Sequence, residues 1–349
     1  MKFNIKMAEL EIKKITNNTQ PKSVNGQNIE KINIKDYEIG EKLYKCNYGY
    51  ISFCKKHKTN KIYSLKIIKK STILDKKIIE RHYNEYKNLS LLYHPFIVEL
   101  KGINTNDPIN LYFLLEFVSG GTLKNFIKLN KTLSLNQAKF YLGCLITILD
   151  YIHKKNIIHR DIRPENILIN HNGYIKLGEF ALSKKLEDNF TYSLCGSPEY
   201  YSPEMINKTG YNKSIDFWQT GIFLYEMLVG FTPFNDNDPI KIFKNINKGK
   251  IIFPKGFDRN TKNIIMSFLK VDVNKRLGCT KKGIFEIIKH PFFKGFDWEK
   301  LLHRELESPF NPYSNLFFDF TRYQKLKNNC SEKAEDGIPK ERDPFYNWE

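Results

Sequence analysis

The sequence predicts an α+β fold of two lobes, in which a small lobe of antiparallel strands is followed by a larger helical lobe. Three observations predict it. Apolar and polar residues alternate from about residue 37 to 69, as in half-buried strands. After residue 121 the apolar residues recur mainly at helical spacing. Between the two patterns lies Gly120-Gly121, a pair that permits a flexible joint between lobes.

The small lobe is expected to contain several strands and one helix. Alternation is clearest over residues 50–53 and 62–67, and the turn-like residues 58–60 separate these two segments. Residues 73–92 change to helical spacing, and the apolar segment 111–117 predicts another strand. Short connections between successive strands favour antiparallel pairing.

The large lobe is expected to be mainly helical. Helical spacing predicts helices over residues 136–153, 214–229 and 260–269. Two short apolar segments, 157–158 and 167–169, read as buried strands on either side of a polar loop. A chain of 349 residues with 41% apolar content can bury a core of this size.

These patterns divide the chain into four parts. Residues 1–35 form a polar N-terminal arm with one candidate amphipathic helix at 7–15. Residues 36–118 form the small lobe, 119–296 the large lobe and 297–349 a C-terminal tail.

Several classes of protein are excluded by the composition. The N-terminus lacks the apolar run of a secretory signal, no segment approaches the roughly 18 to 20 apolar residues that span a bilayer, and Lys2 excludes N-myristoylation. The six cysteines include no CxxC pair and no histidine at metal-ligand spacing, which argues against a disulfide framework or a zinc site. We expect a soluble protein of the cytoplasm or nucleus without a membrane partner.

The net charge of +18, from 56 basic and 38 acidic residues, has two interpretations. The lysines are spread along the whole chain and interleaved with Asn and Ile, as on the solvated faces of a globular protein. A confined basic stripe with interleaved aromatic residues is not present. We therefore expect no nucleic-acid partner, and salt-sensitive DNA binding driven by charge is the alternative.

The polar loop at residues 159–166 carries the strongest functional signal. It places Asp161 and Asn166 five positions apart, beside Arg160 and Arg163. Phosphoryl transfer needs such a set, because a carboxylate can accept or orient the proton of an attacking hydroxyl while a carboxamide oxygen holds a metal that bridges the phosphates. A polar turn without function is the alternative, but buried strands on both sides favour reactive residues on a rigid scaffold.

Several motifs, each weak alone, follow one another in a specific order. They are a strand with Gly49, a strand with Lys66, a helix with Glu85, the joint at Gly120-Gly121, the loop with Asp161 and Asn166, and the segment 202–204. In this order they resemble the eukaryotic protein kinase family from residue 37 to 296. The resemblance implies a protein-kinase-like fold and an ATP-dependent protein serine/threonine kinase that uses ATP and Mg²⁺.

This resemblance implies a role for each matching residue. Asp161, Arg163 and Asn166 would be catalytic, and Glu179 would hold the metal together with Asn166. The residues expected around the nucleotide are Leu43, Gly49, Ile51, Ser64, Lys66, Glu85, Glu116, Val118 and Leu168. Among them, the lysine would contact the α- and β-phosphates and pair with the glutamate of the small-lobe helix.

A closer resemblance is to the AGC group, and within it to the catalytic subunit of the cyclic-nucleotide-dependent kinases, because residues 194–200 closely follow the LCGTPEY signature. It implies that Ser193 takes the place of the activation-loop phosphothreonine, with Arg81, Arg160 and Lys184 as the cations that receive the phosphate. An ordinary loop serine is the alternative. A cyclic-nucleotide-binding regulatory subunit would be a partner.

Other matches imply structural roles and a substrate class. Glu204 would pair with Arg276, and a buried Asp216 would brace the catalytic loop. The aromatic segments 317–320 and 345–348 resemble the tail segments that cover the adenine and dock on the small lobe. Protein substrates with basic residues near the target are expected, and the acidic residues that would recognise them are Glu165, Glu199 and Glu226.

Two departures from the family leave catalysis open. Tyr44 and Cys46 stand where the phosphate-covering loop has glycines, which would let the backbone approach more closely. Glu179 replaces the metal-binding aspartate, so its carboxylate lies one methylene, roughly 1.5 Å, farther from the backbone. The alternative to an enzyme is a pseudokinase, a nucleotide-binding or scaffolding module with weak or no catalysis. Retention of the lysine, the helix glutamate and the loop aspartate and asparagine together favours the enzyme.

Overall fold

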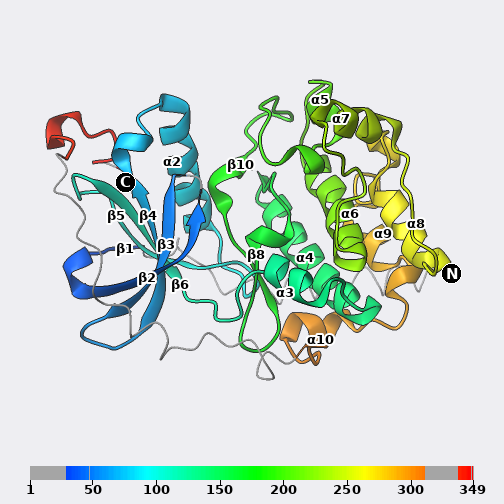
Figure 1. The fold of residues 1–349 in the computed structure, drawn as a ribbon, viewed down its shortest axis with the longest axis horizontal. Helices are drawn as coiled ribbons and strands as arrows, with labels where there is room; N and C mark the ends of the chain where they lie inside the picture. The colour runs from blue at the N-terminus through cyan, green and yellow to red at the C-terminus, as the bar shows by residue number, and fades with distance from the viewer. Residues whose placement is uncertain (1–28, 47, 311–336, 347, 349) are drawn as a thin grey trace.

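The computed structural model describes residues 29–46, 48–310, 337–346 and 348. A sheet lobe, at the left of Figure 1, lies beside a helical lobe at the right. The predicted α+β architecture of two lobes is confirmed. The helix expected at 7–15 and the tail segment 317–320 lie outside the described residues.

The small lobe is built on a six-stranded sheet with the strand order β1-β5-β6-β4-β3-β2. Its strands are β1 Glu30–Lys31, β2 Tyr37–Cys46, β3 Gly49–Lys56, β4 Ile62–Lys69, β5 Leu100–Asn104 and β6 Asn110–Glu116. Each strand is antiparallel to its neighbours except β1, which runs parallel to β5. β1 lies within the expected polar arm. It joins the sheet because Ile32 beside it is buried in an apolar cluster and donates its N–H to Ile103 O at 3.0 Å.

Helix α2, Lys76–Leu91, lies beside this sheet and supplies Glu85. The Asp75 carboxylate starts the helix by accepting a hydrogen bond from the backbone N–H of Lys77 at 2.8 Å. The helix buries one side only, which explains the helical spacing in the sequence.

The end of the C-terminal tail docks on the small lobe, as the aromatic segment 345–348 predicts. The Trp348 ring lies 5.3 Å from that of Tyr83 and 6.5 Å from that of Tyr86, both on α2. Beside this contact, Lys70 forms an ion pair with Asp343 in which neither side chain is more than 3% exposed. The tail is therefore held by an apolar contact and by a buried charge pair.

The large lobe contains eight described α-helices and four short strands. The helices are α3 Leu123–Asn130, α4 Leu135–Lys154, α5 Pro203–Ile206, α6 Ser214–Val229, α7 Pro239–Lys248, α8 Arg259–Phe268, α9 Ile284–Ile288 and α10 Trp298–His303. The strands are β7 Ile157–Ile158, β8 Ile167–Ile169, β9 Ile175–Leu177 and β10 Lys184–Lys185. The three predicted helices appear as α4, α6 and α8, and the two predicted strands appear as β7 and β8.

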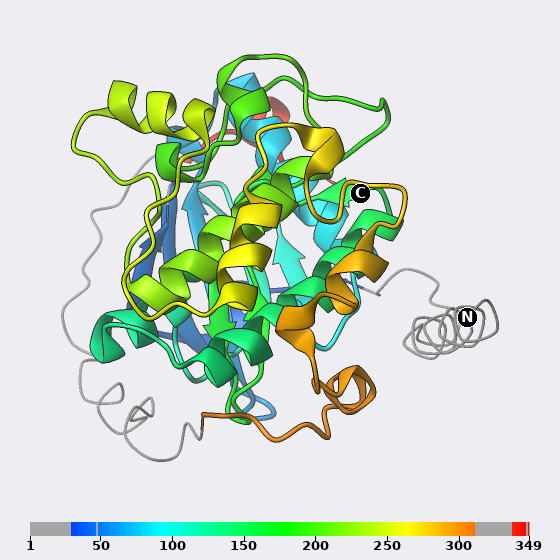
Figure 2. The same cartoon turned by 90° about the vertical axis from the view of Figure 1, so that its right-hand side faces the viewer.

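Helix α6 lies at the centre of the large lobe. It contacts α4 on one side and α8 on another, and Figure 2 shows these helices stacked around it. Nearly every residue of α6 is buried, Trp218 completely, and the buried set includes the polar side chains of Asp216 and Glu226. This helix is a rigid base for the catalytic loop.

One apolar core runs through both lobes. It includes Leu89 and Phe113 from the small lobe and Ile158 and Phe180 from the large lobe. Because the core is continuous, the functional side chains between the lobes are held from both sides. Among the described residues, none of the helices combines the length and the apolar character that a membrane crossing requires.

Candidate active site

The catalytic loop is held by a buried aspartate of α6. The Asp216 carboxylate is fully buried and accepts hydrogen bonds from the backbone N–H groups of His159 at 3.0 Å and Arg160 at 2.8 Å. His153 Nε2 lies 2.7 Å from the same carboxylate. Burial alone would raise the pKa of Asp216, but these hydrogen bonds lower it. Arg160 has a φ of 68°, an unfavourable backbone conformation that this external support maintains.

The loop brings Asp161 and Asn166 into direct contact. Asn166 Nδ2 donates to Asp161 Oδ2 at 2.6 Å and to the Asp161 backbone oxygen at 2.8 Å. Asp161 Oδ1 is buried and has no hydrogen-bond partner within the described part of the chain. Burial raises the pKa of Asp161, against the opposing charges of His159 and Arg163. One carboxylate oxygen is therefore fixed, and the other is left to accept a proton from a hydroxyl group.

A buried lysine lies between two glutamates that come from different elements. Lys66 Nζ on β4 is 2.7 Å from Glu85 Oε1 on α2 and 2.8 Å from Glu179 Oε1, which follows β9. The Lys66 and Glu85 side chains are each 3% exposed. Burial alone would lower the pKa of Lys66, but the charges of Glu179 and Glu85 raise it above its usual value. The expected Lys66–Glu85 pair is present, and the contact with Glu179 is one that the sequence does not indicate.

His82 makes a further contact with the charge cluster formed by Lys66, Glu85 and Glu179. Its Nδ1 lies 3.2 Å from Glu85 Oε2, and its ring meets that of Tyr48 edge to face at 5.7 Å between centroids. The His82 side chain is 4% exposed, and its Nε2 has no partner among the residues that the structure describes. The sequence gives no sign of this role for His82, because a histidine three residues before a glutamate also occurs on exposed helix faces.

A left-handed turn directs Glu179 towards the cleft. Glu179 has φ 54° and ψ 68°, and Phe180 after it is fully buried in the core. The Phe180 ring packs edge to face on His159, with 4.8 Å between the ring centroids. Glu179 and the catalytic loop are thereby fixed to the same core.

Asn166 and Glu179 line one cavity between the lobes and offer the oxygen donors that suit a magnesium ion. Because the Asn166 nitrogen faces Asp161, its side-chain oxygen is left for a ligand. In the described residues, no group of three or more His, Cys, Asp or Glu side chains could hold a metal ion by itself. Mg²⁺ at nucleotide sites takes few protein ligands and completes its shell with phosphates and water. The donors therefore fit a metal that arrives with a nucleotide.

The cavity between the lobes has a volume of about 50 Å³. Four of the predicted nucleotide residues line it: Ile51, Lys66, Glu85 and Leu168. The other predicted ones are not in its lining: Leu43, Gly49, Ser64, Glu116 and Val118. Val98 and Leu115 complete its apolar wall. The sequence gives no sign of either, since Val98 lies in the segment before β5, Leu115 lies on β6, and an apolar residue does not show which surface it lines.

Two of the predicted nucleotide residues make other contacts. Glu116 Oε1 lies 2.6 Å from Lys176 Nζ and accepts the Glu99 N–H at 2.8 Å. Gly49 is required by the sheet, because a Cβ atom there would lie 1.9 Å from the backbone oxygen of Ile67 on β4. The packing of the sheet therefore requires glycine at position 49, whether or not the segment covers a phosphate.

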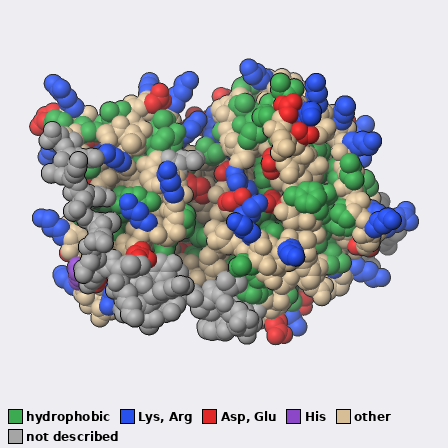
Figure 3. Space-filling view, in the orientation of Figure 1, with side chains coloured by type: hydrophobic (Ala, Val, Ile, Leu, Met, Phe, Trp, Pro, Cys, Tyr) green, Lys and Arg blue, Asp and Glu red, His purple; other side chains and the backbone are tan. Residues whose placement is uncertain are grey.

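Tyr44 makes the cavity narrow. It lies on β2 where the family has a glycine, and it lines the cavity together with Lys66 and Glu179. The residue is 40% exposed, but burial of its hydroxyl, and then the charge of Glu179, raise its pKa well above the usual value. Tyr44 thus shares this cavity with the charge cluster. Figure 3 shows the groove between the lobes, with charged side chains gathered at its large-lobe side.

The segment that ends at residues 202–204, which matches the family's activation segment, places Ser193 against one of its three expected cations. Arg160 Nη1 donates to Ser193 Oγ at 2.8 Å. Lys184 Nζ donates instead to Thr191 Oγ1 at 3.1 Å, and Arg81 lines a small cavity behind the charge cluster. Arg160 thus links the catalytic loop to the expected phosphorylation site.

The acidic residues expected to recognise a substrate already have partners within the chain. Arg163 Nε lies 2.9 Å from Glu165 Oε2, and the Arg163 guanidinium also donates to the Ser197 hydroxyl. Glu199 Oε2 accepts the Thr232 hydroxyl at 2.9 Å. Glu226, fully buried, is bonded by the Tyr200 hydroxyl and by a lysine of α3 that also approaches Glu165.

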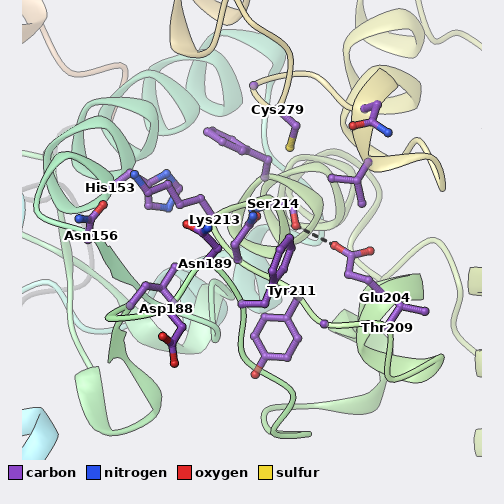
Figure 4. A pocket seen from close by; sticks show the side chains of 18 of the residues that line it. His153, Asn156, Asp188, Asn189, Glu204, Thr209, Tyr211, Lys213, Ser214 and Cys279 are labelled. Carbon is purple, nitrogen blue, oxygen red and sulfur yellow. Dashed lines mark hydrogen bonds between the residues drawn. The ribbon is translucent and has the colours of Figure 1, made fainter.

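A second cavity, of about 820 Å³, lies in the large lobe and is lined in part by residues of the activation segment. Figure 4 shows Tyr211, Lys213 and Glu204 around it, and its dashed line marks the hydrogen bond from the Ser214 hydroxyl to Glu204 at 3.0 Å. Two nitrogens of Arg276 bind the same glutamate at 2.6 and 2.9 Å, which is the expected structural pair. The two cavities share no lining residue, so this one is separate from the candidate active site.

Comparison with known proteins gives matches along most of the chain. The family model described as protein kinase domain matches residues 37–293. The chain is 33% identical over 309 residues to the cAMP-dependent protein kinase catalytic subunit of Arthrobotrys oligospora, covering 88% of this chain and 59% of that protein. It is 34% identical over 310 residues to cAMP-dependent protein kinase type 3 of Saccharomyces cerevisiae, covering 88% and 77%. It is 35% identical over 326 residues to the serine/threonine-protein kinase YPK1 of the same yeast, covering 91% and 47%. The chain thus spans less than two thirds of the length of two of these relatives.

Proposed function

The chain belongs to the protein kinase family, and we propose that it is a serine/threonine kinase that transfers the γ-phosphate of ATP to hydroxyl groups of protein substrates. The observation that carries this proposal is the charge cluster of Lys66, Glu85 and Glu179, which lines the same cleft as Asn166, the partner of Asp161. ATP bound with Mg²⁺ would supply the phosphoryl group and neutralise the charge that develops as it is transferred.

Each residue of the cleft has a role in this proposal. Lys66, held by Glu85, would bind phosphate oxygens, and the Asn166 oxygen together with Glu179 would hold the metal. Asp161 would orient the substrate hydroxyl through Oδ1, the oxygen without a partner among the described residues. Arg163 would keep a positive charge beside the reacting groups while bound to Glu165.

Regulation by phosphorylation of Ser193 is part of the same proposal. A phosphate carries about −1.5 to −2 charges at neutral pH and would strengthen the contact with Arg160. Since Arg160 precedes Asp161 in the catalytic loop, this contact supports a coupling between the activation segment and the catalytic aspartate.

Further parts of the proposal rest on the resemblance. The words "cAMP-dependent" in the names of two relatives, and "catalytic subunit" in one of them, support a cyclic-nucleotide-binding regulatory subunit as a partner. Protein substrates with basic residues near the target are proposed from the resemblance alone. We also propose the division into an arm, a small lobe, a large lobe and a tail at residues 35, 118 and 296, and a cytoplasmic or nuclear location.

A pseudokinase is the second candidate function, and Tyr44 is the observation that favours it. Tyr44 lines the cavity in which phosphates would meet Lys66 and Glu179, and this cavity is small. A nucleotide would have to displace this side chain. If the displacement were too costly, the chain would keep the kinase fold without turnover.

Phosphate incorporation tests the choice between the two candidates. The full chain is incubated with ATP, Mg²⁺ and a set of serine-containing peptides, with Asp161→Asn as the matched control. A kinase incorporates phosphate and the Asp161→Asn variant does so at least about 100-fold more slowly, since it lacks the proton acceptor. No incorporation by either protein supports the pseudokinase, and equal incorporation by both contradicts the role proposed for Asp161.

A further inference from the structure

Lys124 occupies the space between two acidic residues that are expected to recognise a basic substrate. It lies in the first turn of α3, where the Thr122 hydroxyl caps the helix by accepting the Asn125 N–H at 3.2 Å. Lys124 Nζ is 2.5 Å from Glu226 Oε1 and 3.5 Å from Glu165 Oε1. The lysine thus bridges a residue of the catalytic loop and a residue of α6.

The charges around this lysine balance within the chain. Two carboxylates, Glu165 and Glu226, face two cations, Lys124 and Arg163. A basic substrate side chain would therefore meet no excess negative charge here. It would also have to displace Lys124 from Glu226, whose side chain is only 1% exposed. A buried carboxylate without its partner strongly lowers the stability of the protein, so this displacement is unfavourable.

The Lys124 contact is more than a surface ion pair. Exposed pairs of this kind contribute little, but Glu226 is buried and is also bonded by the buried Tyr200 hydroxyl. Burial would lower the pKa of Lys124, but the hydrogen bond and charge of Glu226, with the charge of Glu165, raise it. The lysine is thus held in its charged form.

We propose that Lys124 is an internal occupant of the cation subsite formed by Glu165 and Glu226, so that the protein substrate carries an uncharged residue, not Arg or Lys, at the position that faces this subsite. The inference rests on the proposed kinase function and narrows its substrate class. Glu199 lies outside the bridge, with Thr232 as its hydrogen-bond partner, and remains available to a basic residue elsewhere in the substrate.

The test compares substrates that differ by one charge. A single arginine is placed in turn at each of the four positions before a target serine, and each peptide is compared with its all-glutamine parent. The proteins compared are wild type and two variants, Lys124→Met and Lys124→Gln, which remove the lysine charge. Lys128→Met is the matched control, because Lys128 is an exposed lysine one turn later on the same helix.

The expected result is a change in the discrimination between arginine and glutamine at one position. At that position, wild type and Lys128→Met phosphorylate the arginine peptide less than about threefold faster than the glutamine parent. Both Lys124 variants phosphorylate it about tenfold faster or more, because the arginine then forms the charged hydrogen bonds that Lys124 formed before. A tenfold preference already present in wild type at every position, or no change in the Lys124 variants, overturns the proposal.

A binding measurement separates this inference from the proposed function. The same peptides, with alanine in place of the target serine, are titrated by fluorescence anisotropy, which needs no chemistry. If no protein transfers phosphate but the Lys124 variants gain affinity for one arginine peptide, the kinase assignment fails and the inference stands. If wild type transfers phosphate but the Lys124 variants gain neither rate nor affinity with any arginine peptide, the inference fails. Thermal unfolding of each variant verifies that it is folded.

Discussion

Lys66 Nζ lies 2.8 Å from Glu179 Oε1, although the glutamate is one methylene longer than the aspartate that the family has at this position. The left-handed turn at Glu179 and the buried Phe180 after it fix the backbone, so the additional length carries the carboxylate to the lysine. A bound metal and Lys66 would then share one carboxylate. This arrangement is chemically consistent with a site adapted to glutamate.

The first prediction concerns the length of this side chain. If the site is adapted to glutamate, Glu179→Asp withdraws the carboxylate from Lys66 and does not increase the rate. We therefore expect kcat/KM for phosphate transfer to stay within about tenfold of the wild-type value, a difference of about 1.4 kcal/mol in transition-state stabilisation. Steady-state kinetics with a peptide substrate measure it. An increase of 100-fold or more would identify glutamate as a defect.

The second prediction concerns Tyr44. Replacement by glycine removes the phenol from the cavity, and we expect ATP to bind about five- to tenfold more tightly, because the nucleotide no longer has to reorder a side chain at a cost of about 1 kcal/mol. Titration with a fluorescent ATP analogue gives the dissociation constant. Tyr44→Phe, which keeps the ring, is the control and should resemble wild type; equal affinity of all three proteins would show that the phenol does not obstruct the site.

The third prediction concerns Asp216 and pH. Its pKa is lower in the folded protein than in the unfolded chain, so its contribution to stability is complete above the unfolded-state value of about 4 and is lost as the pH falls through the folded value. Asp216→Asn should therefore cost about 2 to 3 kcal/mol at pH 7 and less at pH 3. Urea unfolding at both pH values, with the exposed Asp188→Asn as control, measures the difference; a cost that does not change with pH would contradict this account.

The fourth prediction concerns the buried pair of Lys70 and Asp343, which holds the tail. Removal of one partner leaves a buried charge, so Lys70→Met should lower the free energy of unfolding by about 3 to 5 kcal/mol. The double variant with Asp343→Leu removes both charges and should recover most of the loss. Chemical denaturation compares these with the exposed Lys77→Met, and a double variant no more stable than the single one would argue against a paired charge.

The fold could be predicted from the sequence where the apolar pattern is strong. Helix α6 could be predicted because its apolar residues recur at helical spacing between a few polar ones, and β7 and β8 because they are short apolar segments beside a polar loop. Helix α7 is not predicted, since only Ile242 and Ile246 of its ten residues are buried and the rest of the helix is largely polar. β1 is missed because two polar residues do not indicate a strand without the partner that β5 supplies.

In the candidate site, too, some residues could be predicted from the sequence and others could not. Asp161, Asn166, Lys66 and Glu85 follow from motif order, and the structure brings Asp161 to Asn166 and Lys66 to Glu85. The contacts of Lys124 could not be predicted, because they join residues 41 and 102 positions away, and no periodicity reports such a distance. The position of the Tyr44 phenol depends in the same way on a side-chain rotamer that the sequence does not determine.

The most direct test of the account is the effect of Mg²⁺ on the stabilisation of the protein by ATP. The unfolding temperature is measured for wild type and Glu179→Gln with saturating ATP, once with Mg²⁺ and once with a chelator, because a ligand that binds the folded state raises this temperature. If Asn166 and Glu179 jointly hold the metal that arrives with the nucleotide, Mg²⁺ adds to the stabilisation of wild type and adds little to that of Glu179→Gln. Equal stabilisation of wild type with and without Mg²⁺ would contradict the account.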